Sequence, residues 1–171
     1  MAGKEYAVKI PDFRTQAAEE TNKAVDQIVK AYREIVADVL GQLRDGNLAN
    51  EGKVHAIYVL GQLRATAAVT VLIEDIDLKA SKFDPKVGLG RWGSYPAQEA
   101  LSKIGNPAVN MILDRLPGEK DELRRKLMCF VLIDVEGKPF GKLRLKLKYD
   151  EETDPAKKKN LELALGIFDM M

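Results

Sequence analysis

A segment of six residues, Val-Leu-Gly-Gln-Leu-Arg, stands at 39–44 and again, letter for letter, at 59–64. An identity of this length is not expected by chance in a chain of 171 residues. The interval of 20 residues corresponds to one helix and a turn. A looser similarity relates 60–74 to 101–114 at an interval of 41 residues, which is typical of a helix pair in an α-solenoid. The repeats therefore predict helix pairs that stack side by side.

Hydrophobic periodicity supports a helical interpretation of most of the chain. Apolar residues step by three and four along 25–43, which predicts a long amphipathic helix over 15–44. Gly46 follows this helix, and we expect it to take the left-handed conformation that ends many helices. Further helices are predicted at about 53–64, 67–76, 106–116, 121–135 and 155–168.

Several helix ends carry their own signals. Asn106 and Asp154 are each followed by proline, which predicts a capping residue and then proline at the first helical position. Asp121 is expected to begin another helix, after Pro117 and Gly118 have ended the one before it.

The segment 142–148 admits two interpretations. Its leucines alternate with Lys or Arg, and this period of two is by itself typical of a strand with a basic face. As a helix, the segment would place Phe140, Leu143 and Leu147 on one face. Because it lies where the second helix of a pair is needed, we predict a helix.

The segment 96–109 reads Pro-Ala-Gln-Glu-Ala-Leu-Ser-Lys-Ile-Gly-Asn-Pro-Ala-Val. This pattern resembles the HEAT-like repeat of the bilin-lyase type, which has an Ala-Leu-x-x-Ile-Gly turn and a second helix that opens with Pro-Ala-Val. Segments 59–63 and 160–166 resemble the first half of the same unit, although no Asp-Pro follows Leu63.

The resemblance and the periodicity together predict an all-α fold, a right-handed superhelix of about three helix pairs with additional terminal helices. We expect one domain over 1–171, with an irregular N-terminal arm at 1–14 and an inserted loop at 77–95. Repeats of this type serve mainly as binding scaffolds.

Composition restricts the chemistry. The chain has one cysteine and one histidine, which excludes an internal disulfide and a zinc site built on several thiolates. The HEAT-like deoxyhypusine hydroxylases use paired His-Glu dipeptides, and this sequence contains none. Cys129 lies in the apolar run 127–133 and is expected to be buried, whereas His55 is expected at the surface. Because no nucleophile–base pair can be placed, we expect a non-catalytic protein without cofactor or metal.

The expected function is to bind a protein or peptide. In a solenoid the second helix of each pair lines the concave face. Charge on that face should change from acidic and polar at one end to basic at the other, and a partner would match this gradient. The exposed positions expected there are Thr70, Glu74, Asn110, Asp114, Lys142 and Lys146.

The loop 77–95 is a second candidate for a binding surface, because it is longer than most connections in compact domains. Arg91, Trp92 and Tyr95 are residue types that often anchor a partner. Alternatively, Trp92 folds back and covers the ends of neighbouring helices, and this is the outcome we expect, because burial of an aromatic side chain is favourable.

Two other functions stay open. The repeat family implies a subunit or relative of a bilin-lyase-type enzyme. The segment 120–159 carries twelve Lys and Arg against eight Asp and Glu, and such a flank could contact a nucleic-acid backbone. The formal net charge of +1 gives no general reason to expect nucleic-acid binding, so a solvated helix surface is the preferred interpretation.

No targeting signal or membrane span is visible. The longest apolar run, 127–133, is far shorter than the ~20 residues that cross a bilayer. The cytoplasm is therefore the default expectation, and a signal peptide removed earlier would instead make the protein secreted or periplasmic.

Overall fold

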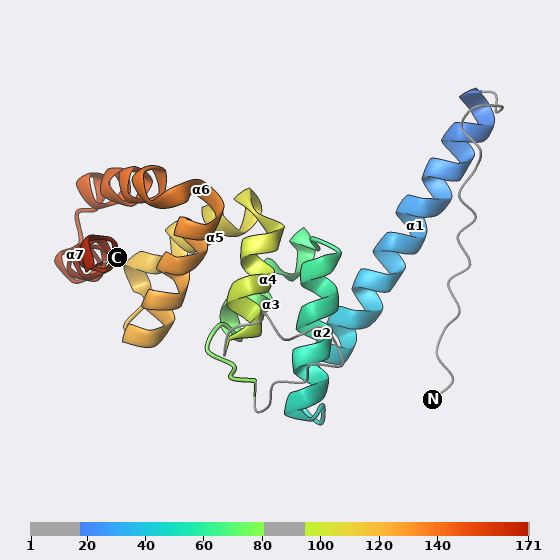
Figure 1. Ribbon diagram of the computed structural model, residues 1–171, viewed down its shortest axis with the longest axis horizontal. Coiled ribbons are helices and arrows are strands. Elements are labelled where there is room, and N and C mark those ends of the chain that lie inside the picture. Colours follow the sequence, from blue (N-terminus) through green and yellow to red (C-terminus); the bar gives the residue numbers. More distant parts are fainter. Residues whose placement is uncertain (1–17, 81–94, 171) are drawn as a thin grey trace.

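The computed structural model describes residues 18–80 and 95–170, and every regular element within these two ranges is helical (Figure 1). This confirms the all-α prediction for the described part of the chain. The expected arm at 1–14 and most of the loop at 77–95 lie outside the described residues. The elements are α1 (Ala18–Leu43), α2 (Asn50–Gln62), η1 (Thr66–Ala68), α3 (Val69–Glu74), α4 (Pro96–Ile104), α5 (Asn106–Arg115), η4 (Leu116–Gly118), α6 (Glu122–Glu151) and α7 (Pro155–Met170).

Helix α6 changes direction at Gly137, whose φ of 76° and ψ of 155° are not helical. Pro139 follows two residues later, and proline lacks the backbone N–H that an unbroken helix would use. We call 122–136 the first half of α6 and 138–151 the second half. The segment 142–148 lies in the second half, which confirms the prediction of a helix rather than a strand.

The helices form two rows, each built from alternate helices of the chain. The first row holds α2, α4 and the first half of α6. Gly61 of α2 packs so closely on α4 that a Cβ placed there would lie 2.8 Å from the Cβ of Ala100. On another side of α4, Ser102 donates a hydrogen bond of 2.9 Å to Oδ2 of Asp134 in α6. These contacts place the first helices of successive pairs next to each other.

The second row holds α3, α5 and the second half of α6. The hydroxyl of Thr70 donates to Sδ of Met111 at 3.3 Å and so joins α3 to α5. Arg144 of α6 donates a hydrogen bond of 2.8 Å to Oδ1 of Asn110 in α5. Helices α2 and α3, helices α4 and α5, and the two halves of α6 thus each contribute one member to each row.

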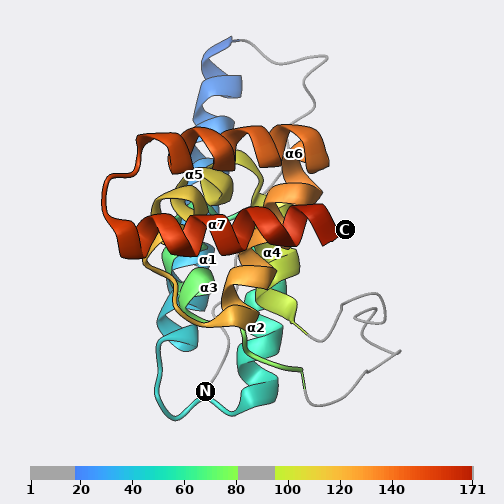
Figure 2. The ribbon, with the colours of Figure 1, turned by 90° about the vertical axis from the view of Figure 1, so that its left-hand side faces the viewer.

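The two ends of the array differ. Helix α1 packs on α2 with its C-terminal half, while its N-terminal half extends away from the other helices (Figure 1). At the opposite end, the second half of α6 and α7 lie across the molecule (Figure 2). None of the helices within 18–80 and 95–170 combines the length and apolar character needed to cross a membrane.

Two helix ends are not built as the sequence suggested. Gly46 does not take a positive φ, and the turn after α1 is closed instead by Asp45, whose Oδ1 accepts the N–H of Asn47 at 3.0 Å. At the start of α5 the capping position belongs to Gly105, with a φ of 82°, rather than to Asn106. In both cases a neighbouring residue takes over the expected role. The Asp45 side chain accepts a hydrogen bond in the turn after α1, and Gly105 tolerates the positive φ at the start of α5.

The two aspartate caps are confirmed. Asp121 Oδ1 accepts the N–H of Arg124 at 2.9 Å at the start of α6. Asp154 Oδ1 accepts the N–H groups of Ala156 and Lys157 at 2.8 and 3.1 Å at the start of α7. Each carboxylate thus satisfies amides that have no partner within the helix.

Candidate protein-binding surface

Three large apolar side chains lie in solvent on the second half of α6. Phe140, Leu143 and Leu147 are 68%, 52% and 53% exposed, whereas Leu145 is fully buried. Their spacing of three and four residues places the three on one side of the helix, opposite the side that Leu145 turns to the core. We call Phe140, Leu143 and Leu147 the α6 apolar face.

The sequence alternation explains how this face arises. Leucine at every second position distributes around a helix, so that only Leu145 of the three leucines from 143 to 147 points inward. Gly141 lies near Leu145 on the inner side, where a Cβ would come within 3.2 Å of Phe168 in α7 and 3.3 Å of the Leu132 carbonyl oxygen. The second half of α6 is therefore fixed tightly from inside while its outer side stays apolar and open.

Ion pairs hold both flanks of the α6 apolar face. On the α5 side, Lys148 pairs with Asp114 at 2.7 Å, and Arg144 pairs with Glu136 at 2.5 Å in addition to its bond with Asn110. On the α7 side, Lys142 pairs with Asp169. These contacts fix the direction of the helix and partly neutralise its basic side chains.

The six residues expected on a concave surface are distributed along the second row. Thr70 is half-buried against α5, and Glu74 is exposed at the end of α3. The structure brings Asn110 and Asp114 of α5 to the second half of α6, through Arg144 and Lys148. Lys142 and Lys146 instead pair with Asp169 and with Asp150, the latter at 3.2 Å. Five of the six side chains, all but that of Glu74, therefore make contacts within the protein.

Of the loop candidates, Arg91 and Trp92 lie outside the described residues. Tyr95 occupies the position before α4 and packs, half-buried, against the core. His55 is exposed on α2, as expected. Cys129 is fully buried, as expected, and burial raises the pKa of its thiol to about 12.

Arg124 forms a junction that sequence reasoning did not find. Its guanidinium donates to the carbonyl oxygens of Ile73 and Glu74, both at 2.9 Å, and pairs with Asp77 at 2.5 Å and Glu119 at 3.0 Å. Partial burial disfavours its charge, but the hydrogen bonds with Glu119 and Asp77 outweigh burial and raise the pKa of Arg124. The junction fastens the C-terminal end of α3 to α6. Three of the four partners lie 47 to 51 residues from Arg124, too far in sequence to form a recognisable motif.

The basic segments within 120–159 also meet acidic or aromatic neighbours. Lys159 pairs with Glu162 at 3.0 Å, and the Lys158 ammonium lies 4.7 Å from the centre of the Tyr149 ring. Together with the pairs of Arg144, Lys146 and Lys148 these contacts break the positive charge into local pairs, which weakens the field that a phosphate backbone would meet.

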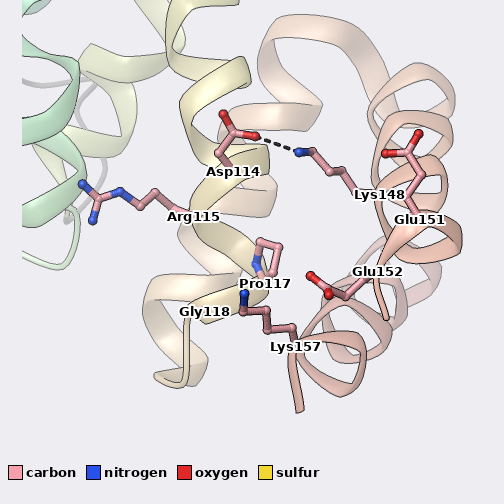
Figure 3. Close-up of a pocket in the computed structure, with 8 residues that line it drawn as sticks. All are labelled: Asp114, Arg115, Pro117, Gly118, Lys148, Glu151, Glu152 and Lys157. Atoms are coloured by element: carbon pink, nitrogen blue, oxygen red, sulfur yellow. Dashed lines mark hydrogen bonds and ion pairs between the residues drawn. The ribbon is translucent and has the colours of Figure 1, made fainter. Parts of the chain in front are cut away.

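A shallow hollow of about 480 Å³ opens between η4, the end of α6 and the start of α7 (Figure 3). Asp114 and Lys148 pair across its upper part, while Arg115 points away from the other labelled side chains. Three acidic and three basic side chains balance in it, and the hollow is open to solvent, unlike the largely enclosed, apolar sites that bind most small molecules. Its lining residues are Asp114, Arg115, Pro117, Gly118, Lys148, Glu151, Glu152 and Lys157.

Within 18–80 and 95–170, no three His, Cys, Asp or Glu side chains are arranged to hold a metal ion. Comparisons with protein-family models, with curated proteins and with solved structures find no match to this chain.

Proposed function

We propose that the chain is a non-catalytic scaffold that binds an amphipathic helix of a protein partner on the α6 apolar face. The observation that carries this proposal is the exposure of Phe140, Leu143 and Leu147, each more than half exposed on one side of a single helix. Contiguous apolar side chains with a polar rim are typical of interaction sites.

The spacing of the face indicates the kind of partner. A helix recognises another helix through apolar side chains at i, i+3, i+4 and i+7, and Phe140, Leu143 and Leu147 follow this pattern. The face stands on a backbone that Gly141 and Leu145 fix against the core. Little ordering is therefore needed on binding, and the entropy that binding costs is correspondingly small.

The proposed function also includes an arrangement of the helices around the α6 apolar face. We infer a right-handed HEAT-like superhelix in which α3, α5 and the second half of α6 line the concave side. The contact of Thr70 with Met111 between α3 and α5, and the bridges from Arg144 to Asn110 and from Lys148 to Asp114, support it. Helices α1 and α7 then close the two ends of the array.

Selection of peptides from a displayed library on the immobilised protein tests the binding surface. We expect the selected peptides to be amphipathic, to bind the wild-type protein, and to lose binding to Leu143→Glu. Leu163→Glu is the matched control, because Leu163 is 47% exposed on α7 and does not belong to the α6 apolar face. Circular dichroism of each variant establishes that the helical fold is retained.

Three outcomes would contradict the proposal. Peptides that bind Leu143→Glu as well as wild type, or that lose binding only to Leu163→Glu, would place the surface elsewhere. Salt-dependent retention on duplex DNA without peptide binding would favour the basic 120–159 flank. A shift in the absorbance of an added bilin would favour the relation to bilin lyases.

A further inference from the structure

The N-terminal half of α1 presents a second apolar stripe, far from the α6 apolar face (Figure 1). In its C-terminal half, α1 buries Val36, Leu40 and Leu43 against the core. The hydroxyl of Tyr32 donates to the Leu63 carbonyl oxygen at 3.3 Å, which marks where α1 meets the end of α2. We call residues 22–32, which lead up to this contact from the N-terminal side, the α1 overhang.

In the part of the chain that the structure describes, the overhang continues the apolar stripe beyond the helices that cover the C-terminal half of α1. Val25, Val29 and Tyr32 are 44%, 39% and 37% exposed, and Ile28 between them is half-buried. The steps from Val25 to Ile28 to Tyr32 are three and then four residues, the spacing of a seam between two packed helices. The charged residues of the overhang stand outside this seam.

We propose that the overhangs of two copies of this chain pack antiparallel, about a twofold axis between residues 28 and 29. In this arrangement Val25 of one copy lies opposite Tyr32 of the other, and Ile28 lies opposite Val29. All four apolar residues thus meet an apolar residue, because their pattern is symmetric about that point. A surface that matches itself under a twofold rotation is what an isologous dimer requires.

Charge complementarity selects the antiparallel direction. Asp26 and Arg33 are exposed on the edge of the stripe beside Val29, three residues before it and four residues after it. A twofold axis across the helices brings this edge of one copy against the same edge of the other, so that Arg33 reaches Asp26 of the second copy at both ends. The antiparallel arrangement also places the remaining helices of the two copies at opposite ends.

The size of the stripe indicates the strength of the dimer. The overhang is about 16 Å long at 1.5 Å per residue, and it offers four apolar side chains per copy. This is less than the roughly 800 Å² per partner that stable complexes bury. We therefore expect a dimer that forms with rising protein concentration and dissociates on dilution.

Sedimentation equilibrium over a range of concentrations tests the proposal directly. We expect the wild-type protein to move from monomer to dimer, and Ile28→Glu to weaken the dimer by about 100-fold or more, because two buried apolar side chains are lost per dimer. Val59→Glu is the matched control, since Val59 is 37% exposed on α2 and lies outside the overhang. This control should dimerise as wild type does.

Charge exchange and cysteine pairing test the direction of packing. Asp26→Arg and Arg33→Asp should each weaken the dimer, and the double variant should restore it. Val29→Cys, close to the axis, should form a disulfide-linked dimer, whereas Val25→Cys should not, because the two copies of residue 25 lie about 10 Å apart along the helices.

Three results would overturn the inference. A wild-type protein that stays monomeric at every concentration would show that no second copy covers the stripe. A dimer that survives Ile28→Glu but not Leu143→Glu would move the interface to the α6 apolar face. Equal linking of Val25→Cys and Val29→Cys would show a parallel dimer. These readouts do not depend on peptide binding, so this inference and the proposed function can fail separately.

Discussion

Gly61 lies directly against Ala100, and a Cβ added to the glycine would come within 2.8 Å of the alanine Cβ and 2.9 Å of its Cα. No side chain fits between α2 and α4 at this point, since real Cβ atoms essentially never approach so closely. The contact sets how near the first helices of two successive pairs can lie. The same hexapeptide places Gly41 in α1, where a Cβ would have no neighbour within 4 Å.

We predict that the two glycines respond to the same substitution in opposite directions. Gly61→Ala should destabilise the fold by about 1–3 kcal/mol, because the backbone of α4 must move to admit the methyl group. Gly41→Ala should stabilise it by about 0.5–1 kcal/mol, because alanine favours a helix and meets no clash. Urea unfolding of both variants measures the difference. Equal effects would mean that α2 and α4 are not packed this closely.

Leu101 and His55 should differ strongly in their contributions to stability. Leu101 of α4 is fully buried in the hydrophobic core, and Leu101→Ala should reduce the free energy of unfolding by about 2–5 kcal/mol. His55 is exposed on α2, and His55→Ala should change it by under about 0.5 kcal/mol. Denaturant titration of both variants provides the comparison, and a larger loss for His55→Ala would reverse the burial assignment.

The Cys129 thiol should be unreactive in the native protein. Its side chain is fully buried, its Sγ lies 3.8 Å from the Ala164 carbonyl oxygen, and burial raises its pKa to about 12. The thiolate that reacts with a disulfide reagent is therefore scarce at neutral pH and shielded from the reagent. Ellman's reagent should modify it slowly before urea is added and rapidly afterwards. Val59→Cys, with an exposed thiol, should react at once and serves as the control.

Asp154 should make stability depend on pH in the acid range. Its carboxylate accepts the backbone N–H groups of Lys157 and Ala156, and these bonds lower its pKa below the ordinary value of 3.8. A lowered pKa in the folded protein gives stability that is present above the unfolded value and is lost as the pH falls through the folded value. Asp154→Asn should therefore differ from wild type most at neutral pH. Thermal unfolding across the acid range measures this, and a difference independent of pH would contradict it.

Much of the local structure could be predicted from the sequence. The steps of three and four from 25 to 43 and the aspartates at 121 and 154 predicted α1 and the starts of α6 and α7. These features succeed because helix propensity, amphipathicity and capping depend on residues within one or two turns. The prediction for Gly46 was wrong for an equally local reason, because the Asp45 side chain accepts the Asn47 N–H in this turn.

The candidate surfaces depended on tertiary structure. The alternation at 142–148 could not show that Leu145 would be buried while Leu143 and Leu147 stay in solvent. The expected polar positions Asn110 and Asp114 were chosen correctly as exposed, but the arginine and lysine that bind them come from 34 residues further along the chain. Such contacts follow from how α5 and α6 pack, which no local pattern contains.

The repeated hexapeptide shows most clearly which features follow from the local sequence and which depend on tertiary packing. By itself it predicted helix over 39–44 and 59–64, and the structure has helix as far as Leu43 in the first copy and Gln62 in the second. It could not determine that Gly61 would be pressed against α4 while Gly41 faces solvent. The first four residues of the two copies are helical in both places because backbone preferences are local, but their burial differs because it is decided by the helices that other parts of the chain bring beside them.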